Sequence, residues 1–270
     1  MVDGDKRQVT DDVGGNKRVI QLSHIQKKYD KVVELPSNVF ASLQTLNVRL
    51  VEEGPYNFDG SAYQYKKIWR NISYGFTLCT ELKIFGQQPE GFWAFSNAIL
   101  HRIDNKYQIQ NIDPLGVVTH SGHNFYLPAF SSINMNTRME NDSYKQARNI
   151  MYKDIPEKDR ASFSGWADLM DKVYCTNNNG KWAVLFAITA AFRDFIFKER
   201  GFFTSLFFIG PTGSGKTQIA ESSRNLFMSS TTPSFNLNTG TDAAFFMMLE
   251  NFRNVIVQME EYNDRDISQA

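Results

Sequence analysis

Cysteine is scarce in this sequence. The 270 residues contain two, Cys79 and Cys175, which lie far apart in the chain. They form neither a paired-cysteine redox motif nor a set of metal ligands. Such sparing use of cysteine is typical of a reducing compartment, so we expect a cytoplasmic protein.

An excess of charge and a long apolar run are also missing. The 29 Lys and Arg residues balance the 29 Asp and Glu residues, so the net charge is zero. Contact with nucleic acid would therefore need a local basic patch or an oligomeric channel. The longest apolar run, Trp182 to Phe192, is shorter than the roughly 20 residues that cross a bilayer. We expect it to form a buried helix, and we expect no membrane partner. Residues 1–17 lack the apolar core of a signal peptide.

One stretch carries a specific motif. Residues 210–217 match the phosphate-binding pattern G-x-x-x-x-G-K-[ST] at every position. Gly213 and Gly215 have no Cβ, so the backbone can curl and direct its N–H groups at phosphate oxygens. A helix beginning near Gly215 adds free amides and the positive end of its dipole. We predict that ATP is bound by Gly210, Pro211, Thr212, Gly213, Ser214, Gly215, Lys216 and Thr217. Lys216 would reach the β- and γ-phosphates, and the Thr217 hydroxyl would ligate Mg²⁺.

An acidic pair could complete this nucleotide site. Glu260 and Glu261 directly follow the apolar run Val255–Met259, which predicts a strand ending at the ligand-binding edge of a parallel sheet. Glu260 would help hold Mg²⁺, and Glu261 would orient or deprotonate the attacking water. The catalytic residues would then be Lys216 and Glu261. The alternative is an ordinary strand that ends in solvated acids. Because most such sites have Asp where Glu260 stands, nucleotide binding is better supported than efficient hydrolysis.

The pattern of apolar and turn-forming residues along the chain predicts an α/β protein with four consecutive regions. Its last region alternates strands at Phe203–Ile209, Ser234–Leu237 and Asn254–Met259 with two helices, which predicts a parallel-sheet P-loop core. The expected regions are a flexible lead-in and helix (1–64), a β-rich domain (65–135), a linker and helical pair (136–200), and a partial P-loop ATPase core (201–270).

These motifs resemble a known family. Gly210–Thr217 and Val255–Glu261, preceded by the apolar helix Trp182–Phe197, are similar to the P-loop domain of phage and mobile-element DNA primase/helicases. Those proteins are related to superfamily 3 and AAA+ ATPases. The strings Gly91–Asn97, Ile112–Val118 and Asn124–Phe130 resemble the segment that precedes the ATPase in the mobile-element proteins. The resemblance implies a ring-forming homo-oligomer that hydrolyses ATP to unwind DNA and contacts single-stranded DNA.

Two other functions stay open. The chain ends before any sensor asparagine or arginine finger, so we expect a fragment truncated after the acidic pair. Such a chain could be a nucleotide-sensing interaction module that binds without hydrolysis. A P-loop kinase for small molecules is the other alternative, although Ser229–Asn238 contains no arginine-rich lid.

Overall fold

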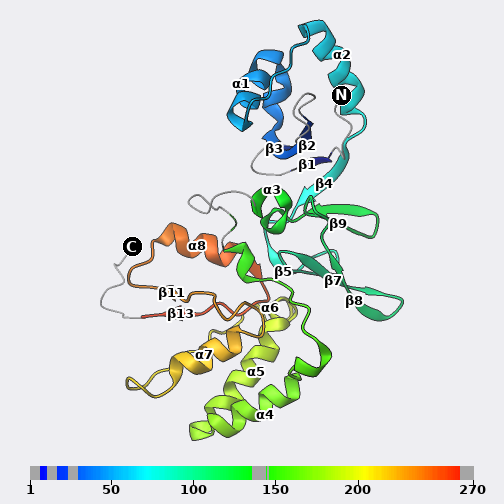
Figure 1. Ribbon diagram of the computed structural model, residues 1–270. Helices are drawn as coiled ribbons and strands as arrows, with labels where there is room; N and C mark the ends of the chain where they lie inside the picture. The colour runs from blue at the N-terminus through cyan, green and yellow to red at the C-terminus, as the bar shows by residue number, and fades with distance from the viewer. Residues whose placement is uncertain (1–6, 11–16, 24–29, 136–143, 145, 262–270) are drawn as a thin grey trace. The chain divides into compact units, whose positions relative to one another are not determined.

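The computed structural model describes residues 7–10, 17–23, 30–135, 144 and 146–261 (Figure 1). The chain divides into two compact units. Unit 1 comprises Met1–Lys83 and Gln110–Tyr144, and unit 2 comprises Ile84–Ile109 and Lys145–Ala270. Each unit therefore combines two separate stretches of chain, which differs from the four consecutive regions expected from the sequence.

Unit 1 contains a mixed sheet of six strands in the order β3-β2-β1-β4-β10-β9. The pairs β1–β2, β2–β3 and β9–β10 are antiparallel, and β4 pairs in parallel with both β1 and β10. The expected flexible lead-in is wrong over β1 and β2, which are strands of this sheet. The elements of unit 1 are β1 (Arg7–Thr10), β2 (Lys17–Ser23), β3 (Asp30–Pro36), η1 (Ser37–Ala41), α1 (Leu43–Glu53), α2 (Ala62–Ser73), β4 (Thr77–Glu81), β9 (Val117–His120), β10 (His123–Tyr126), η2 (Pro128–Phe130) and α3 (Ser132–Met135).

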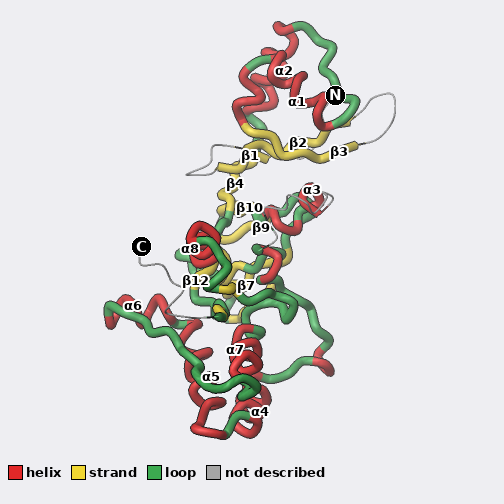
Figure 2. The backbone as a smooth tube through the Cα atoms, turned by 90° about the vertical axis from the view of Figure 1, so that its left-hand side faces the viewer, coloured by secondary structure: helices red, strands yellow, loops and turns green. Residues whose placement is uncertain are grey.

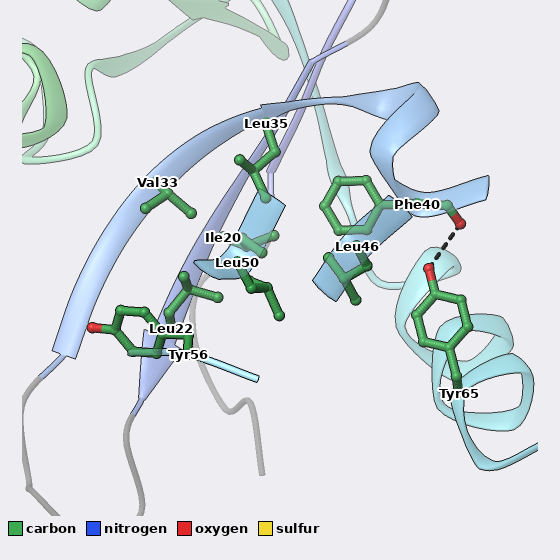
Figure 3. Close-up of a cluster of buried hydrophobic side chains, with 9 residues drawn as sticks. All are labelled: Ile20, Leu22, Val33, Leu35, Phe40, Leu46, Leu50, Tyr56 and Tyr65. Carbon is green, nitrogen blue, oxygen red and sulfur yellow. Dashed lines mark hydrogen bonds between the residues drawn. The ribbon is translucent and has the colours of Figure 1, made fainter. Parts of the chain in front are cut away.

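The main core of unit 1 lies between β2, β3 and the helices α1 and α2 (Figure 3). Alternate residues of the paired strands face the helices, and Ile20 lies opposite Val33 in the register. On α2, the Tyr65 hydroxyl donates a 2.8 Å hydrogen bond to the Phe40 carbonyl. The cluster consists of Ile20, Leu22, Val33, Leu35, Phe40, Leu46, Leu50, Tyr56 and Tyr65.

Local sequence explains where both helices of this core begin. Ser42 precedes α1, and its hydroxyl accepts a hydrogen bond from the Thr45 amide while the Thr45 side chain bonds back to Ser42. Ser61 and Gln64 make the same reciprocal pair at the start of α2. These capping boxes satisfy amides that have no partner inside the helix. Ser37 begins the short η1, and α1 starts after it, at Leu43.

Unit 2 contains a five-stranded sheet in the order β12-β5-β6-β7-β8 and a separate pair, β11–β13. The helices α4 and α5 form a hairpin, and α7 contacts α5 (Figures 1 and 2). The elements of unit 2 are β5 (Phe85–Gln87), β6 (Trp93–Ala94), β7 (Ala98–Ile103), β8 (Lys106–Asn111, which runs into unit 1), η4 (Ala147–Asn149), η5 (Glu157–Asp159), α4 (Phe163–Val173), η6 (Thr176–Asn178), α5 (Asn179–Ala191), α6 (Arg193–Arg200), α7 (Lys216–Arg224), β11 (Phe235–Asn236), α8 (Asp242–Glu250), β12 (Phe252–Arg253) and β13 (Met259–Glu260).

The predicted parallel-sheet P-loop core is wrong. The expected central strand, Phe203–Ile209, is not a β-strand, and Ile209 is 94% exposed. The expected strand before the acidic pair is reduced to β13, which pairs in parallel with β11 over two residues. The larger sheet of unit 2 is antiparallel between β5 and β6 and between β6 and β7. A strand needs a neighbour for its backbone hydrogen bonds, and apolar alternation in the sequence does not reveal whether a neighbour exists.

The expected buried helix also differs from the structure. The run from Trp182 to Phe192 lies mostly in α5, which ends at Ala191. The helix buries its small side chains, Ala183, Ala187 and Ala190, whereas Trp182 and Phe192 are 58% and 60% exposed. An apolar sequence around the whole helix predicted burial on every side. In the structure, neighbouring elements bury the alanine face and cover Val184 and Phe186 only in part.

Candidate nucleotide-binding site

The candidate phosphate-binding loop, residues 210–217, lies in unit 2 and leads directly into α7. Gly213 and Gly215 have positive φ angles of 80° and 83°, which glycine adopts without the steric penalty of a side chain. Gly215 is the N-cap of α7, and no side chain caps the helix. The first amides of α7 are therefore left for another acceptor, as the sequence predicts for a phosphate site.

Lys216 closes the loop upon itself. Its Nζ donates hydrogen bonds of 2.7 Å to the carbonyls of Gly210 and Pro211, and it lies 3.4 Å from the Ser214 hydroxyl. The lysine thus ties the end of the motif to its first two residues. An anion at the loop would give this ammonium a stronger, charge-assisted partner than two neutral carbonyls.

Packing of α7 against α4 fixes the helix that carries the loop. The Trp166 indole N–H donates a 3.0 Å hydrogen bond to the Ser222 hydroxyl on α7. Ile219, one turn into α7, is buried with Met170 and Ala183. The loop therefore rests on a helix that is anchored by both an apolar and a polar contact.

The acidic pair lies at and just beyond β13. Glu260 Oε1 accepts a 2.7 Å hydrogen bond from the Gln258 side-chain amide. Glu261 is exposed and has a positive φ of 60°. Within the described ranges, no hydrogen bond or ion pair joins either glutamate to Lys216 or Thr217. The structure thus brings Lys216 and the loop together, and it does not bring the acids into contact with them.

The donors of the loop suit a triphosphate better than a bare metal ion. Backbone amides, an ammonium and hydroxyls can all donate hydrogen bonds to phosphate oxygens. In the described part of the chain, no three His, Cys, Asp or Glu side chains gather closely enough to hold a metal. A Mg²⁺ ion at this site would be carried by the phosphates, with the exposed Thr217 hydroxyl as a protein ligand.

Tyr174 is a neighbour of the loop that the sequence did not point to. It follows α4, and its ring packs in the cluster of Met170, Ala183 and Ile219. A methyl group placed on Gly215 would lie 3.6 Å from Tyr174 Cε1. In the sequence this tyrosine marks only the end of a helix. Its position beside the loop depends on how α4 and α5 fold back.

A second charged cluster lies in unit 1, on the face of the sheet opposite the main core. Lys17 Nζ is 3.0 Å from Glu34 Oε1 and 3.2 Å from Glu81 Oε2. The Tyr126 hydroxyl donates a 2.6 Å hydrogen bond to Glu34 Oε2. Each charge is met by an opposite charge or a hydroxyl, so the cluster acts as an internal cross-link between four strands.

Burial and charge shift the pKa values in this cluster. Burial alone would lower the pKa of Lys17, but Glu34, Tyr144 and Glu81 raise it above its ordinary value. Burial raises the pKa of Tyr126, and the neighbouring Glu34 raises it further. Burial, Glu34 and Glu81 raise the pKa of Tyr144, against the opposing effect of Lys17. The cluster therefore favours a protonated lysine and neutral tyrosines.

Comparisons with protein families, with curated proteins and with solved structures found no match for this chain. The resemblance to primase/helicases thus rests on the motif residues alone. None of the helices in the described ranges combines the length and apolarity needed to cross a bilayer.

Proposed function

We propose that this protein binds ATP with Mg²⁺ at residues 210–217 and hydrolyses it as the motor part of a DNA primase/helicase. The observation that carries the proposal is the loop itself. Two glycines with positive φ lead into an uncapped helix start, and the motif lysine reaches back across the loop. The two glycines and the uncapped helix start suit phosphate binding, and the ammonium of Lys216 lies in the same loop.

The roles within the site follow from the chemistry of the side chains. The amides of 213–217 would hold the phosphates, and Lys216 would leave the Gly210 and Pro211 carbonyls for the β- and γ-phosphates. Thr217 and Glu260 would hold Mg²⁺, and Glu261 would activate water. For Glu260 this requires the Gln258 hydrogen bond to be exchanged for a water of the metal ion.

The motor role rests on the family resemblance. From the same resemblance we infer that the protein assembles as a homo-oligomeric ring and that it contacts single-stranded DNA, and we propose that it is cytoplasmic. With zero net charge, this chain would contact DNA through a local basic patch or through a channel that several copies form.

The first experiment measures binding of ATP·Mg²⁺ by calorimetry for the whole chain and for Lys216→Ala. We expect the variant to bind about 10- to 100-fold more weakly, because it loses charged hydrogen bonds to phosphate. Lys198→Ala removes an exposed lysine of α6 and serves as the matched control, with unchanged affinity. Equal affinity of the chain and Lys216→Ala, or no binding at all, would contradict the proposal.

The second experiment measures ATP turnover with and without single-stranded DNA. Stimulation by DNA, together with a loss of at least about 100-fold in Glu261→Gln at unchanged ATP affinity, supports the motor. A phosphorylated small molecule in place of free phosphate would instead indicate a kinase.

A second candidate function is nucleotide sensing without hydrolysis. It is favoured by the position of the acids, since Glu260 is engaged by Gln258 and neither glutamate contacts the loop in the described contacts. ATP binding that depends on Lys216, with no turnover under any condition, would select this alternative.

A further inference from the structure

Tyr174 is held in place by the turn between α4 and α5. Its amide donates a 3.0 Å hydrogen bond to the Met170 carbonyl, and its own carbonyl accepts a 2.9 Å hydrogen bond from the Gly180 amide. A methyl group on Gly180 would lie 1.9 Å from the Met170 carbonyl oxygen, so only glycine permits this approach. The turn between them passes through Asn177 and Asn178, both at positive φ. The backbone of Tyr174 is therefore fixed from both sides.

The ring of Tyr174 stands where the loop joins α7. One part of it packs against Met170, Ala183 and Ile219, and the residue as a whole is half-buried. Gly215 lies beside the ring, since a methyl group on it would be 3.6 Å from Tyr174 Cε1, and glycine has no side chain that could cover the ring. An aromatic surface is thus left open beside the amides that would bind phosphate.

We propose that Tyr174 is the platform on which the base of the bound nucleotide stacks. The inference rests on the proposed nucleotide binding at 210–217 and adds what recognises the nucleoside. In the proposed binding mode Lys216 takes the β- and γ-phosphates, so the nucleoside would extend from the α-phosphate end of the triphosphate beside the start of α7. Every base has a π-face, so an aromatic platform accepts any base and holds larger purines more tightly. The ligand class is therefore nucleoside triphosphates in general, with purines favoured.

The test compares ATP with inorganic tripolyphosphate, both with Mg²⁺, by calorimetry on the whole chain. Tyr174→Phe keeps the ring and is expected to bind ATP as the parent does. Tyr174→Leu keeps apolar bulk without a π-face, and Tyr174→Ala removes both. We expect Leu and Ala to weaken ATP binding about 10-fold and to leave tripolyphosphate binding unchanged. Both should also abolish the preference for ATP over CTP. Tyr74→Ala, at an 86% exposed tyrosine of unit 1, is the matched control.

The outcomes separate this inference from the function on which it rests. ATP affinity that is unchanged in Tyr174→Leu overturns the platform, provided that the parent chain binds tripolyphosphate. Equal losses of ATP and tripolyphosphate affinity in Tyr174→Leu and Tyr174→Ala also overturn it, because the ring would then only support the loop. If the parent chain binds neither ligand, the proposed nucleotide site fails, and the platform fails with it.

Discussion

The two units treat their large apolar side chains differently. In unit 1, leucines, valines and aromatic rings from β2, β3, α1 and α2 share one buried cluster. In α5 and α6 of unit 2, the buried side chains are the alanines of α5, while large side chains such as Trp182, Leu185 and Phe195 are exposed. Hydrophobic burial is the main source of stability, so a large side chain in the unit 1 cluster contributes more to the fold than an exposed one on α5 or α6.

The difference also separates structure from candidate function. The buried ion cluster and the large core both lie in unit 1, and neither contains a motif that indicates chemistry. The phosphate-binding pattern lies in unit 2, on a loop whose preceding residues, Phe203–Ile209, form no strand. Loops on a supporting scaffold commonly carry binding sites. Here the support comes from α4, α5 and α7.

The largest expected effect is the loss of core packing in unit 1. Leu35 is fully buried, so Leu35→Ala should lower the free energy of unfolding by about 3–4 kcal/mol, through lost burial and the cavity left behind. Leu185→Ala makes the same change at a 52% exposed position of α5 and should cost less than about 1 kcal/mol. Urea unfolding followed by circular dichroism measures both. Equal losses would break the comparison between the units.

A smaller effect is expected from the ion cluster. Lys17→Met leaves Glu34 and Glu81 without their cation and should cost about 3 kcal/mol, because Glu81 is a nearly buried carboxylate. Lys31→Met breaks the more exposed pair of Lys31 with Glu53 and serves as the control, at a cost below about 1 kcal/mol. The same urea experiment applies. If the two variants lose equal stability, the cluster is no stronger than a surface pair.

The smallest effect is a loss of stability at alkaline pH. Lys17, Tyr126 and Tyr144 all have pKa values that are higher in the folded state than in the unfolded chain. Each holds its proton more tightly when folded, so each stabilises the fold below its unfolded pKa and loses that contribution as pH rises. The unfolded values are 10.5 for lysine and 10.0 for tyrosine. Stability should therefore be level up to about pH 9 and lower by about 2 kcal/mol near pH 10.5.

Thermal unfolding at a series of pH values measures this loss. Tyr126→Phe has no hydroxyl to titrate, so its stability should fall less steeply above pH 10 than that of the parent chain. A parallel decline in the two proteins would show that Tyr126 does not contribute to the pH dependence.

Local sequence predicted several elements correctly. Thr241 caps α8 through a 3.2 Å hydrogen bond from the Ala244 amide, and Gly201 ends α6 in the left-handed conformation that glycine favours. The helix α4 falls within the expected helical pair of 136–200, and the expected β-rich region 65–135 contains several short strands. These features depend on residues within about one turn of each other, which a sequence displays directly.

The errors concern contacts between distant residues. The strand expected at Phe203–Ile209 has suitable side chains but no paired neighbour, and the expected buried helix Trp182–Phe192 has too few neighbours to cover it. For the candidate site, the loop was evident from its motif. The neighbouring Tyr174 was not, because it lies 41 positions before Gly215 in the chain.

The sequence by itself determined the glycine conformations of residues 213 and 215, the helix caps and the balance of charge, since each follows from a residue and its near neighbours. Only the tertiary structure decided which strands pair, which face of α5 is covered, and that Lys17 meets Glu34 and Glu81. The reason is physical. Hydrogen bonds between strands, burial and ion pairs act through space, and chain folding brings together groups whose separation in the sequence carries no mark of the contact.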